Sequence, residues 1–192
     1  MFGSKKSTPT DLAVYMHPAE LAQVVAVLEA IAPARCLEWG SGGSTRAILQ
    51  RSPFIQRYVS VEHNADWHAQ VARSIDDPRL SLHLVQPDQP VAKGAKKQDI
   101  QAWDLLAETD RSLMRSYVAF PSSLGLTFDF VLVDGRARTF CMQEGFRLLA
   151  PGGVMILHDA QRTEYHAAAR ALGRATFLEP WHQGQVCLLR KA

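Results

Sequence analysis

The chain alternates short apolar segments with segments that carry an apolar stripe at helical spacing, and this alternation constrains the fold more than any other feature. Segment 18–31 has the stripe of an amphipathic helix, whereas segment 34–39 is a short apolar run and segment 57–62 has the two-residue period of a strand. Strands separated by helices predict an α/β fold, a doubly wound and mostly parallel sheet with helices on both faces.

Further segments continue this pattern to the end of the chain. We expect helices at 18–31, 44–51, 99–114, 140–149 and 164–172, another capped by Asn64, and strands at 34–39, 57–62, 80–85, 128–133, 154–157, 175–178 and 185–189. Only a short loop around Gly184 separates the last two strands, so they should pair antiparallel at one edge of the sheet. The 192 residues are expected to form a single domain.

One region, residues 87–127, interrupts the alternation between the third and fourth strands. Insertions of this length in compact domains usually act as lids or partner surfaces. We therefore expect an inserted lid or substrate-binding region, and a solvated excursion without a function is the alternative.

Composition excludes several classes of protein. The formal net charge of +2 is too weak to argue for nucleic-acid binding, and no apolar run approaches the roughly 20 residues of a membrane helix. Residues 1–10 carry charge without a following apolar stretch, so we interpret them as a loose arm rather than a secretory signal. Cys36, Cys141 and Cys187 match no metal-binding spacing and are interpreted as buried, reduced thiols of a cytoplasmic protein.

A glycine-bearing loop, CLEWGSGGST at 36–45, joins the first strand to the next helix. Glycines there let the backbone turn sharply and approach a ligand closely, and ligands of such sheets bind at the carboxyl ends of the strands. Glu62 ends the second strand, twenty residues after Gly42, where a carboxylate can accept hydrogen bonds from both ribose hydroxyls. The pattern predicts a cofactor that contains adenosine.

Two residues indicate which adenosine cofactor this is. Thr45 stands where the dinucleotide fingerprint requires its third glycine, which disfavours an NAD-dependent oxidoreductase. A Glu38 carboxylate just before the loop would repel a diphosphate and attract an ammonium group. S-adenosylmethionine carries an ammonium group and no phosphate.

Four motifs in order resemble those of class I S-adenosylmethionine-dependent methyltransferases. They are the loop E-x-G-x-G-x-S at 38–44, Glu62, FDFVLVDG at 128–135 and LLAPGGVMILHD at 148–159. The chain also resembles a small bacterial group whose fourth strand ends in VDGRAR. The resemblance implies a Rossmann-like, seven-stranded sheet with a reversed last strand, and S-adenosylmethionine as the cofactor. Ser44 departs from the third glycine of many members.

The resemblance also implies residue roles. The loop would line the methionine part of the cofactor, Glu62 would hold the ribose, and His63, Gln86 or Asp88 would flank the adenine. The cofactor-binding residues expected are Glu38, Gly40, Ser41, Gly42, Ser44, Thr45, Glu62, His63 and Asp134.

Candidate catalytic residues come from the ends of the fourth and fifth strands. An oxygen or nitrogen acceptor often needs a proton removed before it attacks the methyl group. Asp134, His158 and Asp159 form an acid/base set there, with His158 as the expected general base because its ordinary pKa is near neutrality. A structural role for His158 and a helix-capping role for Asp159 are the alternatives.

Two further questions concern a metal and the acceptor. Asp134 and Asp159 match two metal-ligand positions of magnesium-dependent catechol-type methyltransferases, but the next position is Ala160, so no metal ligands are assigned and a divalent metal is the weaker expectation. Arg136, Arg138 and Arg162 follow the same strand ends and could bind an anionic acceptor. Scattered surface arginines are the alternative.

The sequence therefore predicts an S-adenosylmethionine-dependent methyltransferase that acts on a small or medium acceptor. Sugar-like and anionic molecules are the candidate acceptors, and a homodimer is the candidate assembly. The alternatives are a catalytically inactive module that binds the cofactor or a partner, and an RNA methyltransferase. The weak net charge counts against RNA. Trp67, Trp103 and Trp181 are expected to be packing residues.

Overall fold

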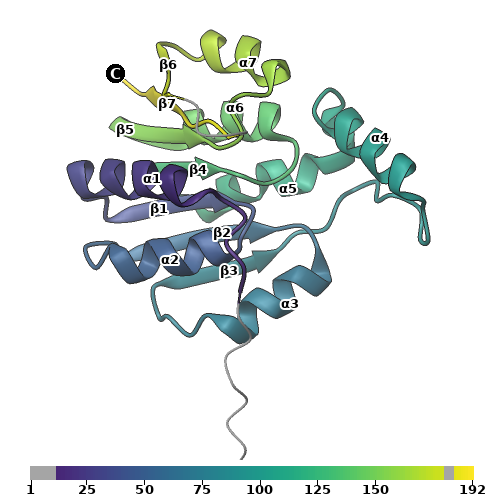
Figure 1. Cartoon of the computed structure of the whole chain (residues 1–192), viewed down its shortest axis with the longest axis horizontal. Coiled ribbons are helices and arrows are strands. Elements are labelled where there is room, and N and C mark those ends of the chain that lie inside the picture. The colour runs from purple at the N-terminus through teal and green to yellow at the C-terminus, as the bar shows by residue number, and fades with distance from the viewer. Residues whose placement is uncertain (1–11, 180–183) are drawn as a thin grey trace, which may run out of the picture.

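A computed structural model describes residues 12–179 and 184–192 of the chain. Within these residues seven strands form one sheet in the order β3-β2-β1-β4-β5-β7-β6 (Figure 1). Strands β1 to β5 pair in parallel, whereas β7 is antiparallel to both β5 and β6. The predicted seven-stranded α/β sheet with a reversed last strand is therefore confirmed. The arm expected at residues 1–10 and the packing role expected for Trp181 lie outside the described residues.

The elements follow the predicted order closely. The strands are β1 (Arg35–Trp39), β2 (Arg57–Glu62), β3 (Leu80–Leu84), β4 (Phe128–Val133), β5 (Leu149–Leu157), β6 (Ala175–Phe177) and β7 (Cys187–Arg190). The α-helices are α1 (Pro18–Ile31), α2 (Gly43–Arg51), α3 (Ala65–Ser74), α4 (Lys97–Ala107), α5 (Arg115–Ala119), α6 (Arg138–Leu148) and α7 (His166–Ala171).

Each face of the sheet is covered by its own apolar cluster. Successive strand side chains point to opposite faces. In β1, Leu37 and Trp39 pack with side chains of α5 and α6, while Cys36 packs with those of α1 and α2. All three side chains are fully buried. Burial on both faces is what a doubly wound sheet requires, and it explains why the strands read as apolar runs.

The insertion differs from its prediction. One helix was expected over 99–114, but α4 ends at Ala107 and a 3-10 turn follows at Arg111–Met114. The side chain of Asp110 accepts a hydrogen bond from the Ser112 N–H at 2.9 Å, a local bond that competes with continued helix.

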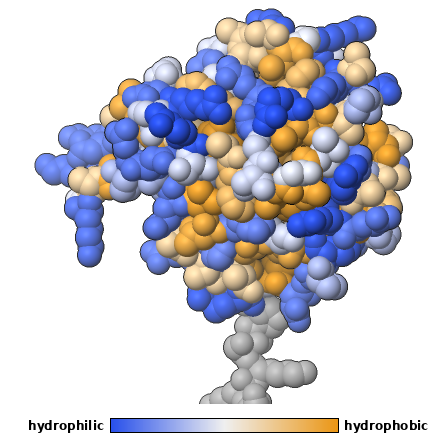
Figure 2. Space-filling view, turned by 180° about the vertical axis from the view of Figure 1, so that it is seen from behind, coloured by the Kyte–Doolittle hydropathy of each residue, from blue (hydrophilic) through white to orange (hydrophobic). Residues whose placement is uncertain are grey.

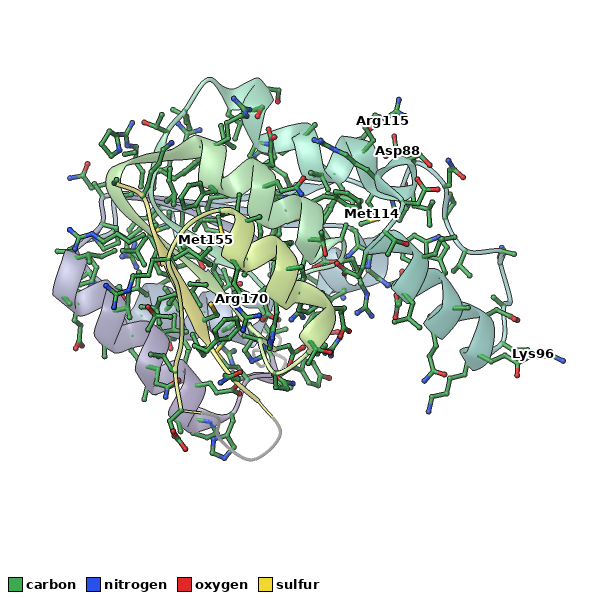
Figure 3. All side chains as sticks on the ribbon, turned by 90° about the horizontal axis from the view of Figure 1, so that it is seen from above. Asp88, Lys96, Met114, Arg115, Met155 and Arg170 are labelled. Carbon is green, nitrogen blue, oxygen red and sulfur yellow. The ribbon has the colours of Figure 1, made fainter. Side chains whose placement is uncertain are left out.

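The two halves of the insertion have different surroundings. Met114 and Tyr117, at and after the turn, are fully buried in the cluster under the sheet. Helix α4 instead projects from the body of the molecule as an arm (Figures 1 and 2). Lys96 lies at the far end of this arm (Figure 3). Half of the insertion therefore belongs to the core.

The sheet topology also decides where a ligand can bind. The strand order reverses between β1 and β4, and the carboxyl ends of these parallel strands meet at one edge of the sheet. Such a switch point opens a crevice above the strand ends. No helix among the described residues is long and apolar enough to cross a bilayer.

Candidate functional site

A cavity of about 520 Å³ opens at the carboxyl ends of β1, β2, β4 and β5. Its volume is within the range of small-molecule sites. Most residues that the sequence singled out line it: Gly40, Ser41, Gly42, Ser44, Glu62, His63, Asp134, His158 and Asp159. Sequence reasoning had not assigned a binding role to several others: Tyr15, Gly43, Asn64 and Trp67. Glu38 and Thr45 do not line it.

The glycine loop needs its glycines for two different reasons. Gly40 has φ of 92°, in the left-handed region, and a Cβ atom there would lie 2.7 Å from the Gly135 Cα. The ends of β1 and β4 can approach each other only because both positions lack a side chain. Gly42 has an extended backbone, and a Cβ atom there would only contact Trp67 at 3.6 Å. The space at Gly42 therefore faces the cavity and is free for a ligand.

Glu38 lies beneath this loop. Its Oε2 accepts hydrogen bonds from the hydroxyls of Thr45 and Ser60, each at 2.7 Å, and the Thr45 hydroxyl in turn accepts from the Gly42 N–H at 2.8 Å. Burial raises the pKa of Glu38 to about 8, against the lowering effect of the hydrogen bonds from Ser60 and Thr45. The side chain is then neutral at pH 7. Its contribution is support of the loop, and the predicted repulsion of a diphosphate by Glu38 loses its basis.

Glu62 is the carboxylate that faces the cavity. Its Oε1 accepts hydrogen bonds from the backbone N–H groups of His63 at 2.8 Å and Asn64 at 2.7 Å. From the residues that the structure describes, its Oε2 accepts one long bond, 3.4 Å, donated by the Ser41 hydroxyl. One oxygen is thus fixed by the backbone, and the other retains capacity to accept hydrogen bonds from a ligand.

An aromatic pair flanks the loop at the mouth of the cavity. Trp67, in the first turn of α3, donates its indole N–H to the Ser41 carbonyl at 2.6 Å. Tyr15, on the segment before α1, packs with Trp67 at a ring-centroid distance of 5.8 Å. Trp67 is thus part of the cavity wall as well as a packing residue. Trp103 of the arm donates to the Gln89 carbonyl and is not in the cavity lining.

The residues proposed beside the adenine do not all reach the cavity. His63 lines it, but neither Gln86 nor Asp88 does. The Asp88 carboxylate accepts hydrogen bonds from the Ser116 backbone N–H at 2.7 Å and the Ser116 hydroxyl at 2.6 Å. Figure 3 shows Asp88 near Arg115 at the base of the arm. Asp88 therefore connects the start of the insertion to Ser116 of α5.

A buried arginine, Arg138, holds together the part of the cavity that is formed by the ends of β4 and β5. The Arg138 guanidinium donates to the carboxylates of Asp134 at 3.2 Å and Asp159 at 3.0 Å. It also donates to the backbone carbonyls of Asp134 at 3.0 Å, Gly135 at 2.9 Å and His158 at 2.6 Å. One side chain thus joins the ends of β4 and β5. An acceptor cannot use this guanidinium without breaking those bonds, which removes Arg138 from the predicted anion-binding set.

The other two arginines are also paired. Arg136 lies 3.0 Å from an Asp104 oxygen on α4, and Arg162 lies 2.9 Å from an Asp159 oxygen. Both guanidinium groups are partly exposed and line the cavity. They could reach an acceptor only by leaving these carboxylates.

His158 lies between two acids. Its Nδ1 is 2.7 Å from an Asp134 oxygen, and its Nε2 is 3.4 Å from an oxygen of Glu20 on α1. Burial lowers the pKa of His158, but the hydrogen bond and charge of Asp134 raise it more, so the net shift is upward. The upward shift favours the protonated form of His158, which opposes the predicted role of general base.

The carboxylates at this end carry no metal-binding arrangement. The part of the chain that the structure describes contains no group of three or more His, Cys, Asp or Glu side chains suited to a metal ion. Between Asp134 and Asp159 lies the Arg138 guanidinium, a cation already supplied by the protein.

Three solved structures that have the same fold are described as methyltransferases or as methyltransferase-like. A methyltransferase-like protein from Silicibacter pomeroyi DSS-3 matches at 20% identity with a TM-score of 0.62, over 94% of this chain and 90% of that chain. An O-methyltransferase from Bacillus cereus, solved with S-adenosylhomocysteine (SAH), matches at 14% identity and 0.60, over 95% and 84%. An amino pentose methyltransferase from Micromonospora echinaspora, solved with S-adenosylmethionine (SAM), matches at 18% and 0.57, over 91% of each chain.

Sequence comparison adds nothing to this result. No protein-family model matches the chain, and no curated protein is similar to it in sequence. The resemblance that the motifs predicted is therefore confirmed at the level of the fold.

Proposed function

We propose that this chain, which has the fold of those methyltransferases, is an S-adenosylmethionine-dependent methyltransferase acting on a small or medium-sized acceptor. The observation that carries the proposal is the cavity at the switch point, which combines a glycine-bearing loop with a free Glu62 oxygen. Three of its neighbours in fold are described with SAM or SAH bound. One of them is an amino pentose methyltransferase of calicheamicin biosynthesis, and another is an O-methyltransferase of tomaymycin synthesis.

The residues of the cavity fit this cofactor. Gly40 and Gly42 open a cradle at the end of β1, and Glu62 offers an acceptor oxygen for ribose hydroxyls at the end of β2. The Glu62 carboxylate that lines the cavity favours a cofactor with a positive charge over a diphosphate. That electrostatic argument now rests on Glu62, because Glu38 is buried and neutral and Asp134 is paired with Arg138 and His158.

The cofactor supplies a methyl group already activated on a sulfonium sulfur. The protein has to hold the acceptor in line with that group, exclude water and receive a proton. Asp134, His158 and Asp159 meet at the ends of β4 and β5, where all three line the cavity, and are the candidate groups for this work. The methyl group would pass to an oxygen or nitrogen lone pair of the acceptor, and the acceptor's proton would pass to a carboxylate.

We assign no metal to this reaction. The Arg138 guanidinium already neutralises Asp134 and Asp159, so a divalent cation would have to displace a buried side chain that makes several hydrogen bonds.

The test is titration calorimetry of SAM, SAH and NAD. SAM should bind and NAD should not. Glu62→Gln keeps an oxygen for the backbone N–H groups but loses the acceptor that faces the cavity. Its SAM affinity should fall by about 1–3 kcal/mol, or roughly 5- to 150-fold. Asp66→Asn, an exposed carboxylate on α3 outside the cavity, is the matched control and should bind normally.

Two results would contradict the proposal: NAD binding in place of SAM, or a Glu62→Gln affinity equal to that of Asp66→Asn. SAH release in the presence of amino sugars and phenols then separates an enzyme from an inactive binding module. Binding of SAM without any SAH release across such a set would favour the module.

A further inference from the structure

Glu20 is a buried acid that no part of the sequence pattern assigned. It lies in the first turn of α1 and is 3% exposed. One oxygen accepts the His17 backbone N–H at 3.0 Å and lies 3.4 Å from His158 Nε2. The other has no hydrogen-bond partner among residues 12–179 and 184–192. It packs against Gly184, where a Cβ atom would overlap it. A helix cap alone does not require an acid to be buried in this way, because capping side chains are usually exposed to water.

The His158 ring joins Glu20 to the cavity. Both ring nitrogens face a carboxylate, Asp134 on one side and Glu20 on the other. A carboxylate is only a hydrogen-bond acceptor, so both nitrogens can be satisfied only if each carries a proton, which is the imidazolium form.

Two other charged groups lie close to the ring. Asp159, the next residue on the chain, favours the imidazolium, whereas Arg138 of α6, which donates to the His158 carbonyl, opposes it. This cluster thus holds three carboxylates, from Glu20, Asp134 and Asp159, and one buried permanent cation, Arg138. A second cation on His158 brings the charges closer to balance, as buried ionised groups require. Arg162, which is more exposed, pairs with Asp159 from outside.

We propose that Glu20 is a positioning residue: its carboxylate keeps His158 protonated, and the imidazolium fixes the Asp134 carboxylate toward the cavity. The importance of this arrangement for catalysis rests on the proposed function, because Asp134 is then the group left to receive the acceptor's proton. The base expected at His158 is thereby moved to Asp134. Glu20 itself does not line the cavity and acts only through the ring.

Two substitutions separate the charge of Glu20 from its role as a cap. Glu20→Gln keeps an oxygen that can accept the His17 N–H but removes the negative charge. Glu20→Asp keeps the charge on a shorter side chain. Glu29→Gln, an exposed acid on the same helix, is the matched control.

The decisive measurement is the pH titration of the His158 ring nitrogens by NMR in the protein without cofactor, assigned with His158→Gln. In Glu20→Gln the midpoint of His158 should fall by about one pH unit or more, the size expected for losing a nearby opposite charge. Glu29→Gln should leave the His158 midpoint unchanged, and Glu20→Asp, whose carboxylate lies farther from the ring, should lower it by less than Glu20→Gln does.

An unchanged His158 midpoint in Glu20→Gln would overturn the proposal. If Glu20→Gln does not fold, Glu20→Asp decides: a midpoint equal to that of the unchanged protein, although the shorter side chain lies farther away, counts against coupling. Calorimetry with SAM is read separately. Loss of SAM binding by the unchanged protein would refute the proposed function while leaving the titration of His158 as it is.

Discussion

The two ends of the cavity are built by different means. The glycine-loop end, comprising Gly40, Gly42 and Glu62, is held by backbone groups and by uncharged hydrogen bonds beneath the loop. The charged end, comprising Asp134, Arg138, His158 and Asp159, is held by ion pairs between α6 and the ends of β4 and β5.

Because of this difference, the two ends should be sensitive to different kinds of substitution. The glycine-loop end depends on space, because added side-chain atoms would meet backbone. The charged end depends on balance, because a buried charge that loses its partner is costly. Substitutions of one kind should therefore damage one end and spare the other.

The largest effect is expected at the charged end. Arg138→Met would leave Asp134 and Asp159 without the cation that joins them, and the free energy of unfolding should fall by about 3–5 kcal/mol. Urea unfolding at pH 7 measures this. Arg162→Gln removes a half-exposed guanidinium from the same Asp159 and should cost less than about 1 kcal/mol. Equal losses of unfolding free energy in the two variants would show that the buried ion pairs of Arg138 contribute no more to stability than the half-exposed pair of Arg162.

A smaller effect is expected at the glycine-loop end. Gly40→Ala forces a side chain into a left-handed backbone and against the backbone of Gly135, and should destabilise the protein by about 2–3 kcal/mol. Gly42→Ala is the control. Its backbone is extended and the new methyl group meets only Trp67 at van der Waals distance, so stability should change by less than about 0.5 kcal/mol. SAM binding should nevertheless weaken in Gly42→Ala, since the methyl group occupies the cradle. Equal melting temperatures for the two variants would contradict this account.

The smallest effect tests whether Glu38, which supports the glycine loop from beneath, is uncharged in the folded protein. The folded-state pKa of Glu38, about 8, is above its ordinary value of 4.5, so between these pH values the folded protein holds a proton that the unfolded chain has released. Stability should therefore fall as pH rises through this window. Glu38→Gln cannot ionise, and its stability relative to the unchanged protein should rise by about 2 kcal/mol between pH 5 and about pH 6.5. A difference that is constant with pH would mean that Glu38 is ionised in the folded state.

Much of the fold could be predicted from local patterns. Segments 57–62 and 128–133 were predicted with the bounds that the structure has, because strand burial leaves apolar runs that end at polar or glycine residues. The 99–114 helix was predicted too long, since periodicity does not reveal that a local hydrogen bond at Asp110 stops it. The core position of Tyr117 also carried no local signal.

Some residues of the candidate site were predicted correctly and others were not, because local sequence patterns do not reveal burial or contacts. Glu38 and Glu62 look alike in the sequence, since each is an acid at or near the end of a strand. Strand register places the first beneath the loop and the second at its open side. Trp67 could have been found by its place in the first turn after Glu62, whereas Glu20 gave only a helix-cap signal.

By itself, the sequence determined the alternation of strands and helices, the turn at Gly40 and the strand ends that carry polar groups. These features follow from backbone geometry over a few residues, which periodicity and glycine placement report directly. Only the tertiary structure decided that Arg138 joins Asp134 to Asp159 and that Glu20 reaches His158, because charge pairing and burial depend on distances between residues far apart in the chain.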